Sequence, residues 1–120
     1  MIYLASPYSH PAPSVVRQRY RDACKATVWL LKTHRNVFSP IVHSHPLIRY
    51  GVPNNWEAWA WVDEDFIKRC DEVKVLMLLG WDQSVGVRAE VELAHKFGKL
   101  VSYVSMEDLE ALLDSGVSNG

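Results

Sequence analysis

The chain has 120 residues, 48% of them hydrophobic and 22% charged. This composition is close to that of folded globular proteins and excludes a disordered, collagen-like or disulfide-rich chain. The 13 Lys and Arg residues against 14 Asp and Glu residues give a net charge of -1, which leaves no basic field to bind a nucleic acid polymer. The length fits one domain, expected over residues 1–114, with a flexible tail over residues 115–120.

The cellular setting follows from three absences in the sequence. Cys24 and Cys70 do not have CxxC spacing, the first residues lack the basic start of a signal peptide, and no apolar run is long enough to span a membrane. We therefore expect a cytoplasmic protein with reduced thiols.

The first half of the chain predicts two strands and one long helix. Ile2 to Ala5 is a β-prone run that ends at a proline-rich loop. Apolar residues recur at helical spacing from Ser14 to Thr33, with Ser14 as the expected N-cap. Asn36 to Phe38 reads as a second short strand. Residues 40–55 hold three prolines, a glycine and two asparagines, so we expect a long loop there.

The second half predicts helices in alternation with strands. The expected elements are a helix from Trp56 to Cys70, a central strand from Glu72 to Leu79, a helix from Val85 to Phe97, a strand from Leu100 to Val104 and a helix from Met106 to Leu113. This alternation predicts an α/β fold, a flavodoxin-like or Rossmann-like doubly wound three-layer sandwich around a parallel sheet of about five strands.

One glutamate lies on the apolar side of the predicted helix 85–97. At about 100° per residue, Glu90 falls inside the apolar stripe, whereas Glu92 points to the opposite side. The stripe consists of Val87, Val91, Ala94 and Phe97. Because a buried carboxylate without a partner costs several kcal/mol, the position of Glu90 needs an explanation and that of Glu92 does not.

Asp63 shows the same anomaly in the predicted helix 56–70. The apolar arc of this helix consists of Trp56, Trp59, Ala60, Phe66, Ile67 and Cys70. Asp63 sits near the centre of that arc. Each carboxylate could be a structural acid satisfied by a backbone N–H, a tyrosine hydroxyl or an arginine, but two such acids favour a functional interpretation.

The position of Glu90 along the chain strengthens this interpretation. Glu90 follows the predicted central strand, so it lies beside the carboxyl ends of the strands, where open α/β sheets bind ligands. Two carboxylates at one cleft suit chemistry at a glycosidic carbon, because one can attack or stabilise that centre while the other handles a proton.

Three segments resemble the nucleoside 2-deoxyribosyltransferase superfamily. The first is Ser84 to Glu90, which has the pattern Ser-x-Gly-x-x-x-Glu after a hydrophobic strand. The second is Tyr3 to Tyr8, which has the pattern Tyr-Leu-Ala-x-Pro-Tyr, and the third is the position of Asp63. A bacterial branch, a domain family of unknown function, shares the segment from Phe38 to His45. The similarity spans roughly residues 1–104.

The resemblance implies a role for each matching residue. Glu90 would be the nucleophile that attacks C1′ of the sugar, Asp63 would bind the nucleobase or its transferring proton, and Tyr3 would orient Glu90. Ser84 and Gly86 would line the sugar or 5′-phosphate end, near a helix N-terminus. The glycosyl-enzyme would then react with a second base in a transferase or with water in a hydrolase.

The chain departs from the superfamily pattern at three positions. Glu92 and Ser6 stand where glycine is common, and Leu100 stands where proline is common. The base, the sugar and the need for a 5′-phosphate therefore stay open. A catalytically silent nucleotide-binding or sensing module that uses the same cleft is the alternative to an enzyme.

The remaining candidates are substrate contacts rather than metal ligands. His43 and His45 would need a third ligand to hold zinc, so we expect no metal and no cofactor. The predicted substrate-binding residues are Ser6, Tyr8, His43, His45, Trp56, Trp59, Ser84 and Gly86. Trp56 and Trp59 can equally pack in the core. Trp61 falls on a polar face, and together with the resemblance it predicts a homodimer or higher homo-oligomer.

Overall fold

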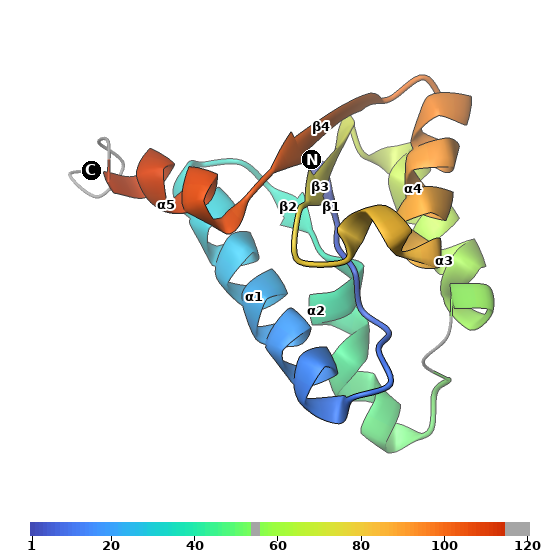
Figure 1. Ribbon diagram of the computed structural model, residues 1–120. Coiled ribbons are helices and arrows are strands. Elements are labelled where there is room, and N and C mark those ends of the chain that lie inside the picture. Colours follow the sequence, from blue (N-terminus) through green and yellow to red (C-terminus); the bar gives the residue numbers. More distant parts are fainter. Residues whose placement is uncertain (54–55, 115–120) are drawn as a thin grey trace.

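Four parallel strands form the sheet in the computed structural model, which describes residues 1–53 and 56–114 (Figure 1). They are β1 (Ile2–Ala5), β2 (Val37–Phe38), β3 (Glu72–Leu76) and β4 (Leu100–Val104), in the order β2-β1-β3-β4. The predicted α/β class is confirmed. The described residues form four strands rather than five, because the alternating pattern itself supplies only four strand-like segments.

Helices cover both faces of this sheet (Figure 1). They are α1 (Pro13–Lys32), α2 (Pro40–Ser44), α3 (Trp56–Arg69), α4 (Val85–Lys96) and α5 (Met106–Asp114), with 3-10 turns η1 (His45–Tyr50) and η2 (Trp81–Gln83). Helices α3 and α4 contact each other on one face, and α1 contacts α5 on the other. None of the helices within the described part of the chain is long and apolar enough to cross a membrane.

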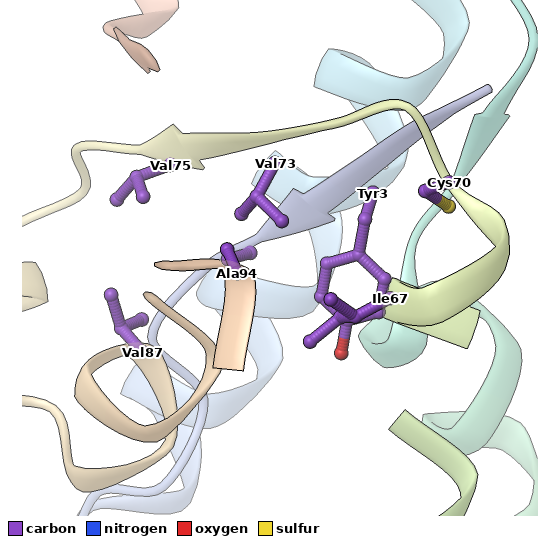
Figure 2. Close-up of a cluster of buried hydrophobic side chains, with 8 residues drawn as sticks. Tyr3, Ile67, Cys70, Val73, Val75, Val87 and Ala94 are labelled. Carbon is purple, nitrogen blue, oxygen red and sulfur yellow. The ribbon is translucent and has the colours of Figure 1, made fainter. Parts of the chain in front are cut away.

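The strand β1 divides its side chains between two buried clusters. Tyr3 and Ala5 pack toward α3 and α4, in a cluster completed by Ile67, Cys70, Val73, Val75, Val87 and Ala94 (Figure 2). Ile2 and Leu4 pack toward α1 and α5, in a cluster completed by Ala26, Leu30, Leu76, Leu78 and Leu109. This alternation follows from the two-residue period of a strand, and burial of β1 on both faces is typical of a central parallel strand.

The region predicted as a loop over residues 40–55 is helical in its first part. Pro40 occupies the first turn of α2, and the Ser39 hydroxyl caps that helix by accepting a hydrogen bond from the Val42 N–H at 3.2 Å. Pro46 has the same place in η1. The prolines were interpreted as breaks, but a proline at the first helical position loses no intrahelical hydrogen bond and has the right φ.

Two further predicted boundaries were wrong. Helix α1 begins at Pro13, so Ala12 rather than Ser14 precedes it, and no side chain caps it. Strand β3 ends at Leu76, where the chain turns and leaves Leu79 95% exposed. The end of α4 was predicted correctly, because Gly98 follows it with a φ of +68°. The predicted tail, residues 115–120, lies outside the described residues.

The strand order defines the place where a ligand can bind. The chain leaves β1 toward β2 on one side and leaves β3 toward β4 on the other, although β1 and β3 are neighbours. Open α/β sheets bind ligands at such a reversal, outside the carboxyl ends of the strands.

Candidate functional site

A cleft of about 440 Å³ opens at this reversal. Its walls come from the loop after β1, from α2 and η1, and from the first turns of α3 and α4. The lining residues are Ser6, Tyr8, Ser9, Pro40, Ile41, Ser44, His45, Ile48, Glu57, Trp59, Asp63, Gln83, Ser84, Val85, Gly86 and Glu90. Both anomalous carboxylates therefore face the same cavity.

The Glu90 side chain is held in place by a hydrogen bond from a tyrosine of the central strand β1. Its side chain is buried, with 4% of the residue exposed, and its carboxylate oxygen Oε2 accepts a hydrogen bond from the Tyr3 hydroxyl. Tyr3 is fully buried on β1, and Figure 2 shows its phenol among side chains from β3, α3 and α4. The strand thus fixes the orientation of Glu90 through a rigid aromatic side chain.

Asp63 reaches the same tyrosine from α3. It is 6% exposed, and burial raises the pKa of its carboxyl from 3.8 to about 7, while a hydrogen bond to Tyr3 partly opposes the rise. Burial, followed by the negative charge of Asp63, also raises the pKa of Glu90 well above its usual value, and the Tyr3 hydroxyl again acts in the opposite direction. The negative charge of Asp63 therefore disfavours ionisation of Glu90.

The Tyr3 phenol itself stays protonated. Burial and the nearby charges of Glu90 and Asp63 raise the pKa of its hydroxyl well above 10. A protonated phenol is a permanent donor, which stabilises whichever carboxylate is ionised. Two adjacent carboxyl groups whose pKa values are both raised can hold one proton between them.

The first turn of α4 leaves open space in front of Glu90. The Ser84 hydroxyl caps the helix by accepting a hydrogen bond from the Val87 N–H at 3.2 Å. Gly86 lies one turn before Glu90 on the same side of the helix. A Cβ at Gly86 would meet only the Ser84 hydroxyl, at 3.9 Å, so the missing side chain keeps the cleft open toward the carboxylate.

An aromatic cluster forms another wall of the cleft. The Tyr8 hydroxyl lies 2.6 Å from Nδ1 of His45, and the His45 ring stacks on Tyr20 with ring centroids 4.1 Å apart. Burial and the positive charge of Arg49 lower the pKa of His45, which favours the neutral imidazole. Trp59 is anchored by a hydrogen bond from its indole N–H to the carbonyl oxygen of Pro53 at 2.5 Å.

The cleft collects most of the residues predicted for it. Ser6, Tyr8, His45, Trp59, Asp63, Ser84, Gly86 and Glu90 all line it, and Tyr3 lies directly behind Glu90. The side chain of Trp56 lies outside the described residues. His43 is not among the residues that line the cleft; its ring contacts Phe38, Trp59 and Phe66, and its predicted contact with substrate stays a prediction. Residues two apart on a helical segment point in different directions.

The sequence analysis missed several lining residues. They are Ser9, Pro40, Ile41, Ser44, Ile48, Glu57, Gln83 and Val85. Four of them belong to α2 and η1, the segment predicted as a loop. Recognising Ser39 followed by Pro40 as a helix start would have revealed one face of that segment.

The described residues 1–53 and 56–114 can be compared with the arrangements that hold metal ions. No group of three or more His, Cys, Asp or Glu side chains is placed there to hold a metal ion. The carboxyl pair is connected to a phenol, an arrangement that can hold and release a proton.

Comparison with protein families places these residues in a known sequence group. A family described as "Domain of unknown function (DUF1937)" matches residues 1–106. The chain belongs to this family. The match spans Tyr3, Asp63 and Glu90 together with all the lining residues. A comparison with curated proteins found no match, so the activity of this DUF1937 domain has to be argued from the site.

Proposed function

We propose that the protein is an N-glycosidic-bond enzyme that acts on a nucleoside or a nucleoside 5′-monophosphate. It would transfer the sugar to a second base or to water through a glycosyl-enzyme intermediate on Glu90. The observation that carries this proposal is the fully buried Tyr3, whose hydroxyl connects two buried carboxyl groups at the floor of one cleft. An ordinary apolar core has no need for such a trio.

In the first step of the proposed reaction, an ionised Glu90 attacks C1′ of the sugar. The bond from C1′ to the base nitrogen breaks, its electron pair goes to the base, and Asp63 donates its proton to that base. The reactive form carries the negative charge of the pair on Glu90 and its proton on Asp63. Burial and the charge of Asp63 raise the pKa of Glu90, and the hydrogen bond that the Tyr3 hydroxyl donates to Glu90 acts against that rise. A pKa of about 7 for Asp63 suits a group that gives up and regains a proton near neutral pH.

In the second step, Asp63 acts as the base. It removes a proton from water or from the incoming nucleobase, whose oxygen or nitrogen attacks C1′ and displaces the Glu90 carboxylate. Two displacements at the same carbon return the original configuration. Both carboxyl groups end in the protonation state in which they began.

A base-release assay tests the proposal. The protein is incubated with ribo- and 2′-deoxyribonucleosides and their 5′-monophosphates, with and without a second free base, and free and exchanged bases are separated by chromatography. Base release or exchange that requires Glu90 supports the enzyme. Binding without any release or exchange would contradict it and favour the alternative, a nucleotide-sensing module.

The assembly state stays a prediction. Trp61 is 73% exposed on α3, and a large exposed indole is typical of a contact surface. We expect a dimer or larger homo-oligomer in sedimentation experiments at micromolar concentration, whereas a 13.7 kDa species alone would contradict this expectation.

A further inference from the structure

The charge of the cleft lining bears on which substrate it accepts. The described lining residues include the carboxyl groups of Glu57, Asp63 and Glu90 but no Lys or Arg. The undescribed positions 54, 55 and 115–120 contain no Lys or Arg in the sequence. A phosphate group in this cleft would therefore meet negative charge from Glu57 and from the ionised member of the carboxyl pair.

Two arginines lie beside the cleft without lining it. The charge of Arg49 acts on the lining residue His45, and the guanidinium of Arg19 is already hydrogen-bonded within the protein. Arg19 donates one hydrogen bond to the Ser9 carbonyl at 2.8 Å and another to the Leu79 carbonyl at 2.9 Å. It ties the loop after β1 to the loop after β3 and lines a neighbouring cleft rather than the carboxylate cleft. Arg19 also sits so close to Gly80 that a Cβ there would lie 2.9 Å from Nη2, so the absence of a side chain at Gly80 leaves room for the guanidinium.

The first turn of α4 is the positive feature within the lining itself. Helix N-termini bind anions through their unpaired N–H groups. Here the Ser84 hydroxyl already accepts the Val87 N–H, which removes one of those donors. A phosphate would thus have to bind to the remaining free N–H groups of this helix N-terminus, and it would be repelled by the negative charge of the lining.

Ser6 offers a hydrogen-bonding contact to an uncharged group of a ligand. Its residue is 5% exposed and lines the cleft, and its hydroxyl is the buried side-chain polar atom without a hydrogen-bond partner in the described part of the chain. A buried hydroxyl without a partner costs free energy. A ligand hydroxyl can donate to it and accept from it, which a phosphate dianion cannot do.

We propose that the cleft takes an uncharged nucleoside in preference to its 5′-monophosphate, with the Ser6 hydroxyl bonded to a hydroxyl of the sugar. This inference rests on the proposed function and selects one of its two substrate classes. Ser6 is then a specificity-determining residue, and the acidic lining rejects the phosphate.

The test compares each nucleoside with its own 5′-monophosphate. We expect kcat/KM for the nucleoside to be about tenfold higher or more at low ionic strength, because a charge several ångströms from a carboxylate is repelled. The ratio should shrink as salt is added, since salt screens the charge of the solvent-exposed Glu57. Calorimetric binding of the same pairs to the unmodified protein gives a second readout that needs no turnover.

Two variants separate the acidic lining from the hydroxyl contact. Glu57→Gln should raise kcat/KM for the monophosphate several-fold relative to the nucleoside, whereas Glu92→Gln, an exposed residue of α4 outside the cleft, should not change the ratio. Ser6→Ala should lower kcat/KM for nucleosides about five- to tenfold. A 3′-deoxy or 5′-deoxy analogue that lacks the contacted hydroxyl should be insensitive to Ser6→Ala.

Each result has a defined meaning. A monophosphate used or bound as well as its nucleoside overturns the inference and leaves the proposed function standing. Nucleosides that bind more tightly but release no base contradict the proposed function alone. If neither class binds nor reacts, both proposals fail. Full activity of Ser6→Ala on every nucleoside removes the hydroxyl contact.

Discussion

The two faces of the sheet share the same strands but bury different chemistry. On the α1–α5 face, every member of the buried cluster is aliphatic, including Leu4 and Leu30. On the α3–α4 face, the same strand β1 presents Tyr3, whose hydroxyl meets Glu90 and Asp63. One buried cluster of the sheet is therefore wholly aliphatic, whereas the other lies against two buried ionisable side chains that line the cleft.

This difference shows how the fold divides its tasks. Burial of aliphatic side chains stabilises the folded chain by about 25 cal/mol per Å² of apolar surface, and it requires only close packing. A buried carboxylate lowers stability unless it is hydrogen-bonded or protonated. We therefore expect substitutions on the α1–α5 face to change stability and substitutions of the carboxyl pair to change activity and pH dependence.

The largest effect is expected for Glu90→Gln. Glutamine keeps the shape and can still accept a hydrogen bond from Tyr3, but it is not a nucleophile, so base release should fall at least about a thousandfold. Chromatographic assays and circular dichroism at 25 °C measure activity and fold. Glu92→Gln, on the exposed side of α4, is the matched control and should keep full activity. Equal losses in the two variants would contradict the assignment.

On the other face, Leu4→Ala should give the reverse result. Leu4 is fully buried, and loss of its side chain leaves a cavity that costs about 2 to 5 kcal/mol of unfolding free energy. Urea denaturation measures this change. Activity should fall only in proportion to the fraction of folded protein. A loss of kcat in fully folded Leu4→Ala protein would contradict the expectation that this face affects stability alone.

The pH dependence of stability offers a third comparison. Because the pKa of Asp63 rises from 3.8 to about 7 on folding, the folded chain binds this proton more tightly than the unfolded chain. That stabilisation is complete below pH 3.8 and is lost as the pH rises from there through about 7, a loss of about 4 kcal/mol.

Asp63→Asn removes one of the two titrating groups and should reduce the slope of the stability profile between pH 4 and 8, while Glu90, whose pKa burial also raises, keeps part of it. Urea denaturation at pH 5 and pH 8 measures both proteins. At pH 8 the variant should be more stable than the unmodified protein. An unchanged profile would mean that Asp63 is ionised and well solvated in the folded chain.

A smaller effect is expected for Tyr3→Phe. Without the hydroxyl, the pKa of Glu90 should rise further, because the hydrogen bond that opposes the rise is gone. The acidic limb of the pH–rate profile should shift to higher pH, and kcat should fall about ten- to a hundredfold. A profile that keeps its shape would show that Tyr3 only fills space.

Helical periodicity was enough to find the carboxyl pair. Glu90 and Asp63 were identified because each stands on the apolar side of its helix, and both are buried. Their meeting at one cleft also followed from the position of Glu90 after a central strand. These are local signals, readable within one helix and its preceding strand.

Other parts of the site depend on contacts that no local pattern contains. Tyr3 and Glu90 are 87 positions apart, and only the resemblance indicated their bond. Tyr20, which stacks on His45, reads in the sequence as one more apolar position of α1. The walls formed by α2 and η1 were missed because prolines were interpreted as helix breaks rather than helix starts.

Covalent trapping with a 2′-fluoro nucleoside tests the central claim most directly. Fluorine destabilises the oxocarbenium-like state through which a glycosyl-enzyme decays, so the intermediate should accumulate. Mass spectrometry of the digested protein should then find the fluorinated sugar on the peptide that contains Glu90, and Glu90→Gln should carry none. An adduct on Asp63, or base release from natural nucleosides without a trapped adduct, would contradict the assignment of Glu90 as the nucleophile.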